Sequence, residues 1–529
     1  MKAKEPLFTG SSWTMDLLFR ITDEVKIIAE GELGLNCYTN EIRIITSEQM
    51  LDAYAMNGMP VNYWHHSFGR EFLSHERSYR KGSSLAYEIV INTDPCLVFC
   101  MEDNTATMQA LVIAHAGFGH NHFFKNNYLF KQWTHAHAII DYLEFSRNFV
   151  AECEKKYGIV EVEDFLTACH TWKYYGIDHS PRSEALSAVE ERNQMRERAE
   201  SRQRNLNVIW RIIPESKDDL DDKKLPTFPV DPEGNLLYFI EKNAPSLPDW
   251  KREIIRIVRK QSQYFYPQML TKGMNEGFAC FTHYFIMNRL HEKGLITEGS
   301  WMEFLADHTG VTSQPDFDAK IRVLRGYDPS GQPIVEEIPI YRGINPYGIF
   351  FAIFMDIKRM CENPTEEDKK WFPEIAGKPW LPAIKWAVEN FKDESFLRQY
   401  LSPKVMRDYR LFAIHDDEED DEILISAVHD DDGYRDVRRT IANMYDIHEH
   451  LPDFEVVDVD LRGDRMMKIR HTAHKNKSLD IEETKKALVM LGKLWEYPVT
   501  LTSINRDGEH MSTWVLVDDD VEHSHTASE

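Results

Sequence analysis

Three histidines lie close together in the stretch IAHAGFGHNHFF, which is otherwise mostly apolar. They are His115, His120 and His122. Burying a polar imidazole costs free energy unless the ring is hydrogen-bonded or has a functional role, so the stretch indicates either a metal or acid–base site or histidines satisfied by core hydrogen bonds. His115 and His120 are roughly 140° apart around a regular helix. They can converge if the helix carries a π-bulge or ends near Gly117 or Gly119.

A second apolar helix is expected further along the chain, with three chemically active residues on one face. Glu276, Cys280 and His283 are spaced i, i+4, i+7, which places them on one side of a helix. Residues 278–287 are almost wholly apolar. A carboxylate buried among them must be paired, hydrogen-bonded or bound to a metal.

Inward-facing His and Glu residues on two helices are typical of a helical metal site, for which zinc is the default ion. We therefore predict a divalent metal ion, expected to be zinc, held by His115, His120 and Glu276. His283 is predicted to be a fourth ligand or to orient one of the other three. Because these helices are far apart in sequence, their polar groups must meet in one pocket if the prediction is right.

A hydrolytic metal site also needs a carboxylate beside the bound water as general base. Glu276 and Glu144 are the helix-borne candidates, and Glu88 is a candidate on a strand. His137, Asp141 and Glu144 form a stripe at i, i+4, i+7 that is either a solvated helix face or a support for the site. The sequence contains no GxxxxGK[ST], GxSxG or HExxH motif, which leaves no sign of a P-loop, a serine-hydrolase elbow or a zincin helix.

The elements that must position these residues are mostly helices. Apolar periodicity predicts an opening helix at 11–30 and two short strands within 85–100, which flank a turn at 92–95. Further helices are expected at 104–119, 131–157, 161–173, 247–263, 275–293 and 348–361. A charged excursion at 180–224 is either a solvated helix laced with ion pairs or a mobile arm.

The pattern changes after a run of acidic residues. Residues 413–422 are predicted to be an acidic linker, because consecutive like charges repel and cannot be buried. The order of the elements over 423–520 is then βαββαβ, that of a ferredoxin-like domain, and residues 521–529 are expected to be a disordered tail. The fold class is therefore α+β, with a large helical part at 1–412. A fragment ending near Asp416 is expected to fold without the C-terminal domain.

Charge and cysteine content limit the partners and the compartment. Lys and Arg number 62 against 87 Asp and Glu, a net charge of −25. So acidic a chain is repelled by phosphate backbones and anionic membrane faces, so we expect no nucleic-acid partner and no membrane insertion. Seven scattered cysteines do not form a disulfide framework, and no signal peptide precedes the first helix. We expect a cytoplasmic protein.

At these residues the chain resembles the stage V sporulation protein R (SpoVR) family, and the resemblance runs over nearly the whole length. It is carried by YEIVINTDPC, IAHAGFGHNHFFKNN, ECEKKYGIVEVEDFLTACH, FPVDPEGNLLYFIEKNAP, YFYPQMLTKGMNEGFACFTHY, INPYGIFFAIFMDIKRMCENPTEED, DESFLRQYLSPKVMRDYRLF and LRGDRMMKIRH. The family usually has Trp where Phe278 stands, and often Asp at the position of His122. The positions that match its motifs are His115, His120, Asn126, Asn127, His170, Asn275, Glu276 and His283.

The resemblance implies a physiological setting more than a reaction. The family is named for a role in spore cortex formation, and the cortex is a specialised peptidoglycan. It also occurs in bacteria that form no spores, where it tends to be encoded beside a PrkA-like serine kinase and a von Willebrand A-like protein, which suggests a stress or stationary-phase module. Two functions therefore stay open: a metal-dependent hydrolase, or a non-catalytic interaction protein of the kinase module.

Overall fold

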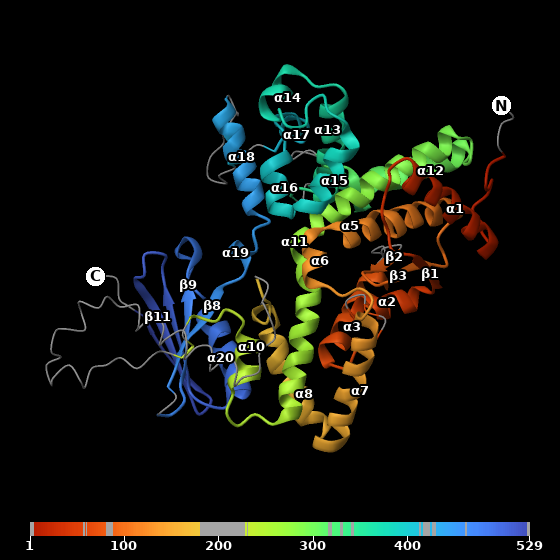
Figure 1. Cartoon of the computed structure of the whole chain (residues 1–529). Coiled ribbons are helices and arrows are strands. Elements are labelled where there is room, and N and C mark those ends of the chain that lie inside the picture. Colours follow the sequence, from red (N-terminus) through yellow and green to blue (C-terminus); the bar gives the residue numbers. More distant parts are fainter. Residues whose placement is uncertain are drawn as a thin grey trace, which may run out of the picture. The chain divides into compact units, whose positions relative to one another are not determined.

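The computed structural model describes residues 5–56, 59, 61–80, 88–179, 228–229, 231–315, 320–327, 332–339, 343–411, 414–415, 424–425, 430–460 and 463–525. The predicted charged excursion and most of the acidic linker lie outside these residues. The α+β class is confirmed, because helices dominate and a five-stranded sheet follows near the C-terminus (Figure 1). Contacts divide the chain into two compact units: unit 1 is Met1–Val61, Ser67–Ile140 and Pro267–Asp446, and unit 2 is Asn62–His66, Asp141–Tyr266 and Ile447–Glu529.

Unit 1 is mainly helical. Its helices are α1 (Met15–Gly31), α2 (Ser47–Ala55), α3 (His66–Arg80), α4 (Ala106–Val112), the π-helix η1 (Ile113–His120), α5 (Asn121–Asn126), α6 (Tyr128–Trp133), α12 (Glu298–Thr312), α13 (Pro346–Glu362), α14 (Glu366–Trp371), α15 (Trp380–Asn390), α16 (Asp393–Tyr400), α17 (Pro403–Asp408) and α18 (Asp431–Asn443). Its strands are β1 (Asn40–Ile45), β2 (Glu88–Ile91), β3 (Cys96–Met101), β4 (Lys320–Tyr327), β5 (Pro333–Pro339), β6 (Ile414–His415) and β7 (Leu424–Ile425).

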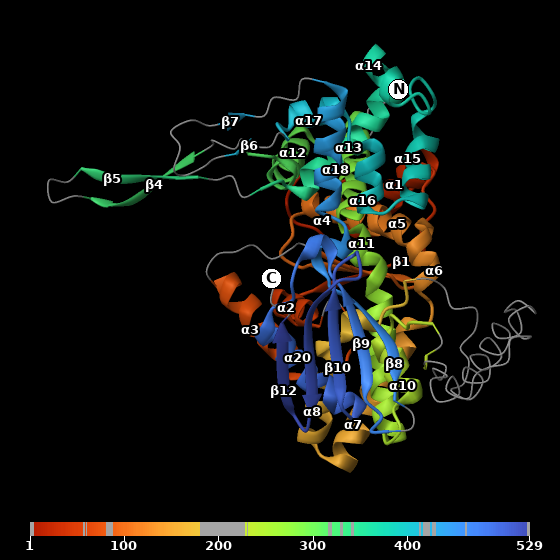
Figure 2. The ribbon, with the colours of Figure 1, turned by 90° about the vertical axis from the view of Figure 1, so that its left-hand side faces the viewer.

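The small sheet of unit 1 has the order β1-β3-β2, with β1 parallel and β2 antiparallel to the central β3. The two strands predicted within 85–100 are confirmed as β2 and β3. Every residue of β3 is buried, as expected for a central strand covered on both faces. Its neighbour β2 begins at Glu88. Because β2 packs against η1, the sheet places the Glu88 carboxylate beside that helix. The hairpin of β4 and β5 extends away from the helices of this unit (Figure 2).

The longest helix is α11 (Asp249–Glu292), which is continuous through Pro267. The sequence predicted two helices here, at 247–263 and 275–293, and Pro267 and Gly273 lie between them. The intervening turns stay helical, and Leu270 and Met274 within them are buried, so burial of this segment outweighs the local preference. The part of α11 that follows Pro267 belongs to unit 1.

Unit 2 contains α7 (Ile139–Tyr157), α8 (Ile159–Thr171), η2 (Lys173–Tyr175), α10 (Leu236–Asn243), the first part of α11, α19 (Ile447–His450), η5 (His474–Asn476) and α20 (Ile481–Trp495). Its strands are β8 (Asp453–Val459), β9 (Met467–Thr472), β10 (Val499–Ile504), β11 (His510–Val517) and β12 (Asp520–His525). They form one sheet in the order β12-β11-β10-β9-β8, with α20 packed on it and α8 packed on α20 (Figure 2).

The ferredoxin-like order of this sheet is a prediction that the structure corrects. The strand expected at 423–428 is described only as β7, which pairs with β6, and the helix that follows it, α18, packs on α16 in unit 1. The sheet therefore has the order ββαβββ, with β9 and β10 parallel on either side of α20. Its last strand, β12, occupies residues that we expected to be a disordered tail.

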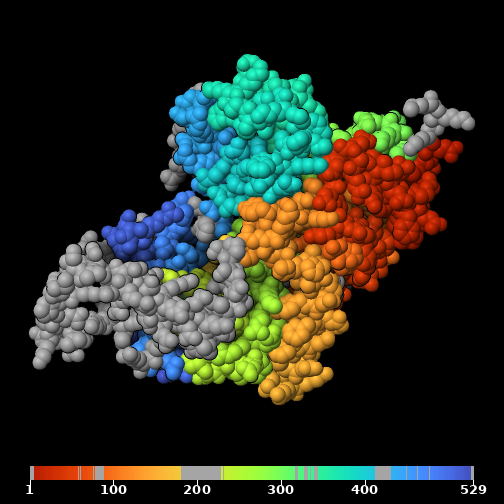
Figure 3. Space-filling model, in the orientation of Figure 1, coloured from red at the N-terminus to blue at the C-terminus, as the bar shows by residue number. Residues whose placement is uncertain are grey.

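The space-filling view shows one outer face of the molecule (Figure 3). The segment that carries α13 to α17, coloured cyan, forms a continuous rounded surface on this face. The core of unit 1 is formed by fully buried apolar side chains from several helices, among them α1, α4, η1, α11 and α13. The predicted metal ligands are embedded in this core.

Candidate metal centre

The helix that carries the histidines changes its winding where they occur. Residues Ile113–His120 form a π-helix between α4 and α5, and a π-helix repeats its hydrogen bonds at i→i+5. His115 and His120 therefore lie about one turn apart, with ring centroids 4.6 Å from each other. Both are buried. The π-geometry that convergence requires is present.

Glu276 on α11 meets both rings. Its Oε2 lies 3.6 Å from Nε2 of His115 and 3.5 Å from Nε2 of His120. Ligand atoms around a tetrahedral metal with bonds of about 2.0–2.1 Å are about 3.3–3.5 Å apart. The three donor atoms thus have the chemistry and the spacing of a divalent metal site, and the three predicted ligands do come together in one place.

A second carboxylate reaches the cluster from the sheet. Oε1 of Glu88 lies 3.7 Å from Nε2 of His115. The Glu88 side chain is 19% exposed and that of Glu276 is 22% exposed, whereas the two histidines are more deeply buried. The carboxylates therefore lie on the side of the cluster that is nearer to solvent.

The imidazole of His120 is held by the residue before Glu276. Nδ1 of His120 lies 2.9 Å from Oδ1 of Asn275. Because an amide oxygen only accepts hydrogen bonds, Nδ1 carries the proton and donates it. In the neutral ring, Nε2 then has a free lone pair that faces Glu276. This tautomer, with the proton on Nδ1, is the one in which Nε2 can bind a metal. The predicted supporting role of Asn275 thus has a physical basis.

The charges of the cluster are strongly coupled. Burial disfavours the imidazolium of His120, but the charge of Glu276 outweighs burial and raises the pKa of this histidine. Burial opposes ionisation of Glu276 as well, but His120 and His115 outweigh it and hold the pKa of this carboxyl well below its usual range. For Glu88, burial dominates and raises the pKa. Two neighbouring carboxyls with opposite shifts are typical of sites that assign them different roles.

His283 faces the other nitrogen of His115. The two Nδ1 atoms are 2.9 Å apart, and Nε2 of His283 lies 2.7 Å from Nδ1 of His308 on α12. Burial and the neighbouring histidines lower the pKa of His283 well below its usual value, so this ring is neutral. His283 is thus near the predicted ligands, but its contact is with the opposite edge of the His115 ring from Glu276.

Three predicted supporting residues belong to hydrogen-bond networks away from Glu276. The backbone N–H of Asn36 donates to Nδ1 of His122, at 2.9 Å, and burial lowers the pKa of His122 to about 4. Asn126 donates to the carbonyls of Asn36 and His122, at 2.8 and 2.7 Å. Asn127 caps the N-terminus of α6 and donates to the backbone carbonyls of Val388 and Phe391. These side chains fix the backbone around η1 and α5.

The remaining predicted site residues do not join the cluster. His137, Asp141 and Glu144 are exposed, but they do not form a stripe on one helix. The helix predicted at 131–157 is interrupted between α6 and α7, so His137 lies in a turn and only Asp141 and Glu144 are on α7. The Glu144 side chain is 60% exposed and pairs with Arg147, at 3.8 Å, whereas the carboxylate that lies beside His115 is that of Glu88. His170 belongs to unit 2, where its Nε2 lies 2.6 Å from the hydroxyl of Tyr63.

Three residues near the cluster were not assigned to it from sequence. They are Cys280, which is fully buried, His308, which contacts His283, and Tyr347. Burial, and to a smaller extent the charges of Glu276 and Glu88, raise the pKa of the Tyr347 phenol. Cys280 shares the i, i+4, i+7 spacing of Glu276 and His283, so the sequence did place it on their helix face. No spacing in the sequence connects His308 or Tyr347 with the residues of the cluster.

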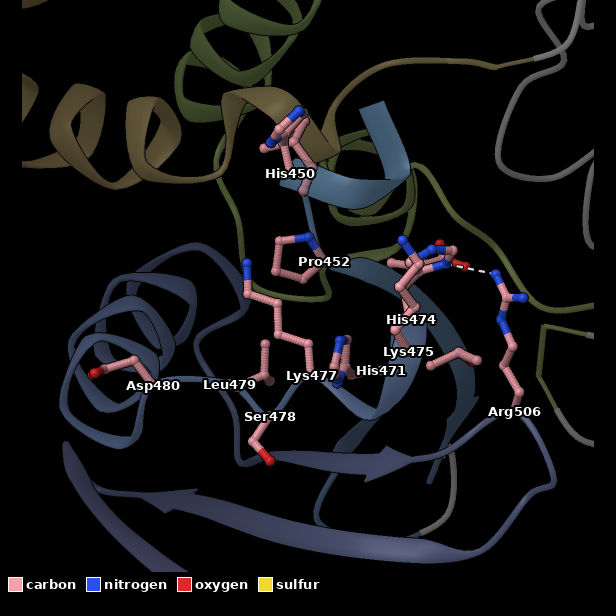
Figure 4. A pocket seen from close by; sticks show the side chains of 13 residues that line it. His450, Pro452, His471, His474, Lys475, Lys477, Ser478, Leu479, Asp480 and Arg506 are labelled. Atoms are coloured by element: carbon pink, nitrogen blue, oxygen red, sulfur yellow. Dashed lines mark hydrogen bonds between the residues drawn. The ribbon is translucent and has the colours of Figure 1, made fainter. Parts of the chain in front are cut away.

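A separate cavity lies in unit 2. Its volume is about 390 Å³, and it opens between the end of β9, the start of α20 and the turn after β10 (Figure 4). Lys475, Lys477 and Arg506 line it together with Asp453 and Asp480, and Arg506 donates to Nδ1 of His474, at 2.5 Å. Its charges nearly balance, and it contains none of the predicted metal ligands.

Comparisons with known proteins cover nearly the whole chain. The family model described as SpoVR like protein matches residues 12–450, and that described as SpoVR-like C-terminal domain matches residues 452–506. The chain is 46% identical to "Uncharacterized protein YcgB" of Escherichia coli over 503 residues, which cover 95% of this chain and 94% of that protein. No solved structure matches. Among the described residues, no helix combines the length and the apolar character needed to cross a membrane.

Proposed function

This chain belongs to the SpoVR family, and we propose that it is a metal-dependent hydrolase with a divalent ion held by His115, His120 and Glu276. The observation that carries the proposal is the convergence of two imidazole Nε2 atoms on one carboxylate oxygen, at 3.6 and 3.5 Å. These donors come from η1 and α11, and apolar core surrounds them. Such a set of buried groups is costly to maintain without a ligand.

Asn275 and Glu88 would have different roles beside the bound ion. A divalent ion such as zinc, when bound, polarises a substrate oxygen and lowers the pKa of a water ligand. Asn275 keeps the His120 ring in the ligand tautomer. Glu88, whose Oε1 lies 3.7 Å from Nε2 of His115, is placed to accept a proton beside the site.

The family resemblance supports peptidoglycan as the first substrate class to test. The same resemblance supports a PrkA-like serine kinase and a von Willebrand A-like protein as the first partners to test, and a cytoplasmic location. The seven cysteines are all free thiols, which fits a reducing compartment.

The proposal is tested first by metal content. Elemental analysis of the purified full chain should give at least one divalent ion per chain, and His120→Ala or Glu276→Ala should lower the content by about one ion. A ligand present at a hundred times its Kd stabilises the folded state by about 2.7 kcal/mol, so added metal should raise the Tm of the wild type by more than that of these variants. His137→Ala, at an exposed position, is the matched control and should behave as the wild type. A wild-type protein without stoichiometric metal would refute the proposal.

Catalysis is tested separately from binding. Glu88→Gln should keep the metal and lower hydrolysis of muropeptide substrates by about 10²–10⁴-fold, the usual contribution of a general base. Glu144→Gln, an exposed carboxylate, is the control. If the wild type binds metal but hydrolyses none of the substrates tested, and the ligand variants lose only stability, the centre is structural and the protein is a non-catalytic interaction protein.

A further inference from the structure

Two further donors lie directly behind the proposed ligands. Cys280 and His283 follow Glu276 on the same face of α11, and both are buried. Their ligand atoms and one nitrogen of His115 all lie within 4.8 Å of one another. These three residues therefore have the spacing of a metal site of their own, beside the one formed by His115, His120 and Glu276.

His115 and His283 form one hydrogen bond, in which a single proton lies between their Nδ1 atoms. Their Nδ1 atoms are 2.9 Å apart, so one nitrogen donates and the other accepts. If Nε2 of His115 is the ligand of the first site, the proton lies on its Nδ1, and Nδ1 of His283 presents a lone pair. Nε2 of His283 then donates to Nδ1 of His308, at 2.7 Å. His308 thus holds the His283 ring with a donor atom facing Cys280 and His115.

The donor set of this second position differs in kind from that of the first. It offers two imidazole nitrogens and one sulfur, whereas the first offers two nitrogens and a carboxylate oxygen. Thiolate ligands favour soft and borderline ions, and carboxylates favour harder ones. The sulfur of Cys280 is buried beside these nitrogens, and a metal ion that binds it replaces the thiol proton.

We propose that Cys280, His283 and Nδ1 of His115 form a second metal position that selects thiophilic ions, with the His115 ring between the two positions. Binding there releases the thiol proton of Cys280. When Nε2 of His115 already holds the first ion, it also releases the proton between the two Nδ1 atoms, which otherwise moves to that Nε2. The inference extends the proposed function, from which it takes the first position.

Cobalt(II) is a suitable probe, because a thiolate bound to it gives an intense charge-transfer band that nitrogen and oxygen ligands do not give. The full chain is stripped with a chelator and titrated with Co²⁺, and the band and the number of ions bound are recorded together. We expect the band in the wild type and in Cys169→Ser, a matched control at a buried thiol of unit 2. Cys280→Ser should lose the band and still bind one ion.

The outcomes separate this inference from the proposed function. Absence of the band at saturating Co²⁺, or its persistence in Cys280→Ser, overturns the second position. In His120→Ala the band should remain while one bound ion is lost. If the band is present but His120→Ala binds as many ions as the wild type, the second position is supported and the first is refuted. If the wild type binds a single ion and shows no band, the first position is supported and the second is refuted.

A second measurement covers the case in which Cys280→Ser does not fold. The wild type is treated with a thiol-alkylating reagent in mild denaturant, with and without Cd²⁺, and the modified cysteines are identified by mass spectrometry. Cd²⁺ should slow alkylation of Cys280 by more than tenfold relative to Cys361, which is also buried in unit 1. Equal protection of the two thiols would show stabilisation of the fold alone and would contradict the inference.

Discussion

A buried carboxylate contacts α11 just before the residues of the cluster. Asp393 is 3% exposed, and its oxygens accept hydrogen bonds from the backbone N–H groups of Gly273 and Met274, at 2.8 and 2.7 Å. Hydrogen bonds of this kind favour the carboxylate, but burial outweighs them and raises the pKa of Asp393 to about 7. The protonated acid is therefore the main form of Asp393 in the folded state below about pH 7.

This shift predicts a pH dependence of stability. An unfolded aspartate has a pKa near 3.9, so the folded state binds the proton more tightly. The stabilisation is complete below about pH 4 and is lost as the pH rises through about 7, with an upper limit of about 4 kcal/mol. Urea unfolding between pH 5 and 8, in chelator, should show this loss in the wild type. Asp393→Asn should remove this component, and exposed Asp141→Asn should retain it. Identical profiles for Asp393→Asn and the wild type would contradict the argument.

Single residues also show what the sequence could reveal. His115, His120 and Glu276 could be identified because each is a polar group in an apolar segment, and such groups need a partner. Glu144 was misplaced because spacing on a helix does not say which face is buried. His308 could not be found, because its role depends on a contact with His283, 25 residues earlier, that leaves no periodic signal.

At the scale of elements, the distance between η1 and α11 is set by a glycine. A Cβ at Gly119 would lie 2.6 Å from Cα and 2.9 Å from Cβ of Ala279, which is too close for either backbone to stay in place. Gly119→Ala should therefore separate the two helices, destabilise the protein by about 1–3 kcal/mol and weaken metal binding, as measured by thermal unfolding and by metal titration.

A second glycine provides the control. A Cβ at Gly310 on α12 would have no neighbour within 4 Å, so Gly310→Ala should be neutral or stabilise the protein by up to about 1 kcal/mol. If Gly119→Ala proves as harmless as Gly310→Ala, the close approach does not position the cluster. The sequence anticipated π-geometry only as a condition for His115 and His120 to meet, because a spacing of five does not by itself distinguish a π-helix from a helix end.

At the scale of the whole molecule, the acidic run does not separate two independent cores. The apolar face of α18, with Ile441 and Ala442, belongs to the buried core of unit 1, although α18 follows the run in sequence. Local pattern predicted this helix but not the core it joins, and the ferredoxin-like topology was wrong for that reason. A fragment that ends near Asp416 lacks these side chains, so we now expect it to be less stable than one that includes α18.

Two fragments test this reassignment. One ends at Asp416 and the other at Asp446, so they differ by the segment that carries α18. Loss of its buried apolar side chains should lower the stability of the shorter fragment by at least about 2 kcal/mol, seen as a lower Tm or as aggregation during expression. Equal melting of the two fragments would mean that α18 contributes nothing to unit 1.

The π-helix also determines how this segment can vary among relatives. One residue removed between His115 and His120 would restore ordinary helical winding, and the two histidines would then be spaced i, i+4, about 40° apart on one face of the helix. The composition would hardly change, and His120 would stay on the side that faces Glu276. In an alignment of homologues, the metal ligands should therefore be present where this segment has a one-residue gap as well as where it has its full length.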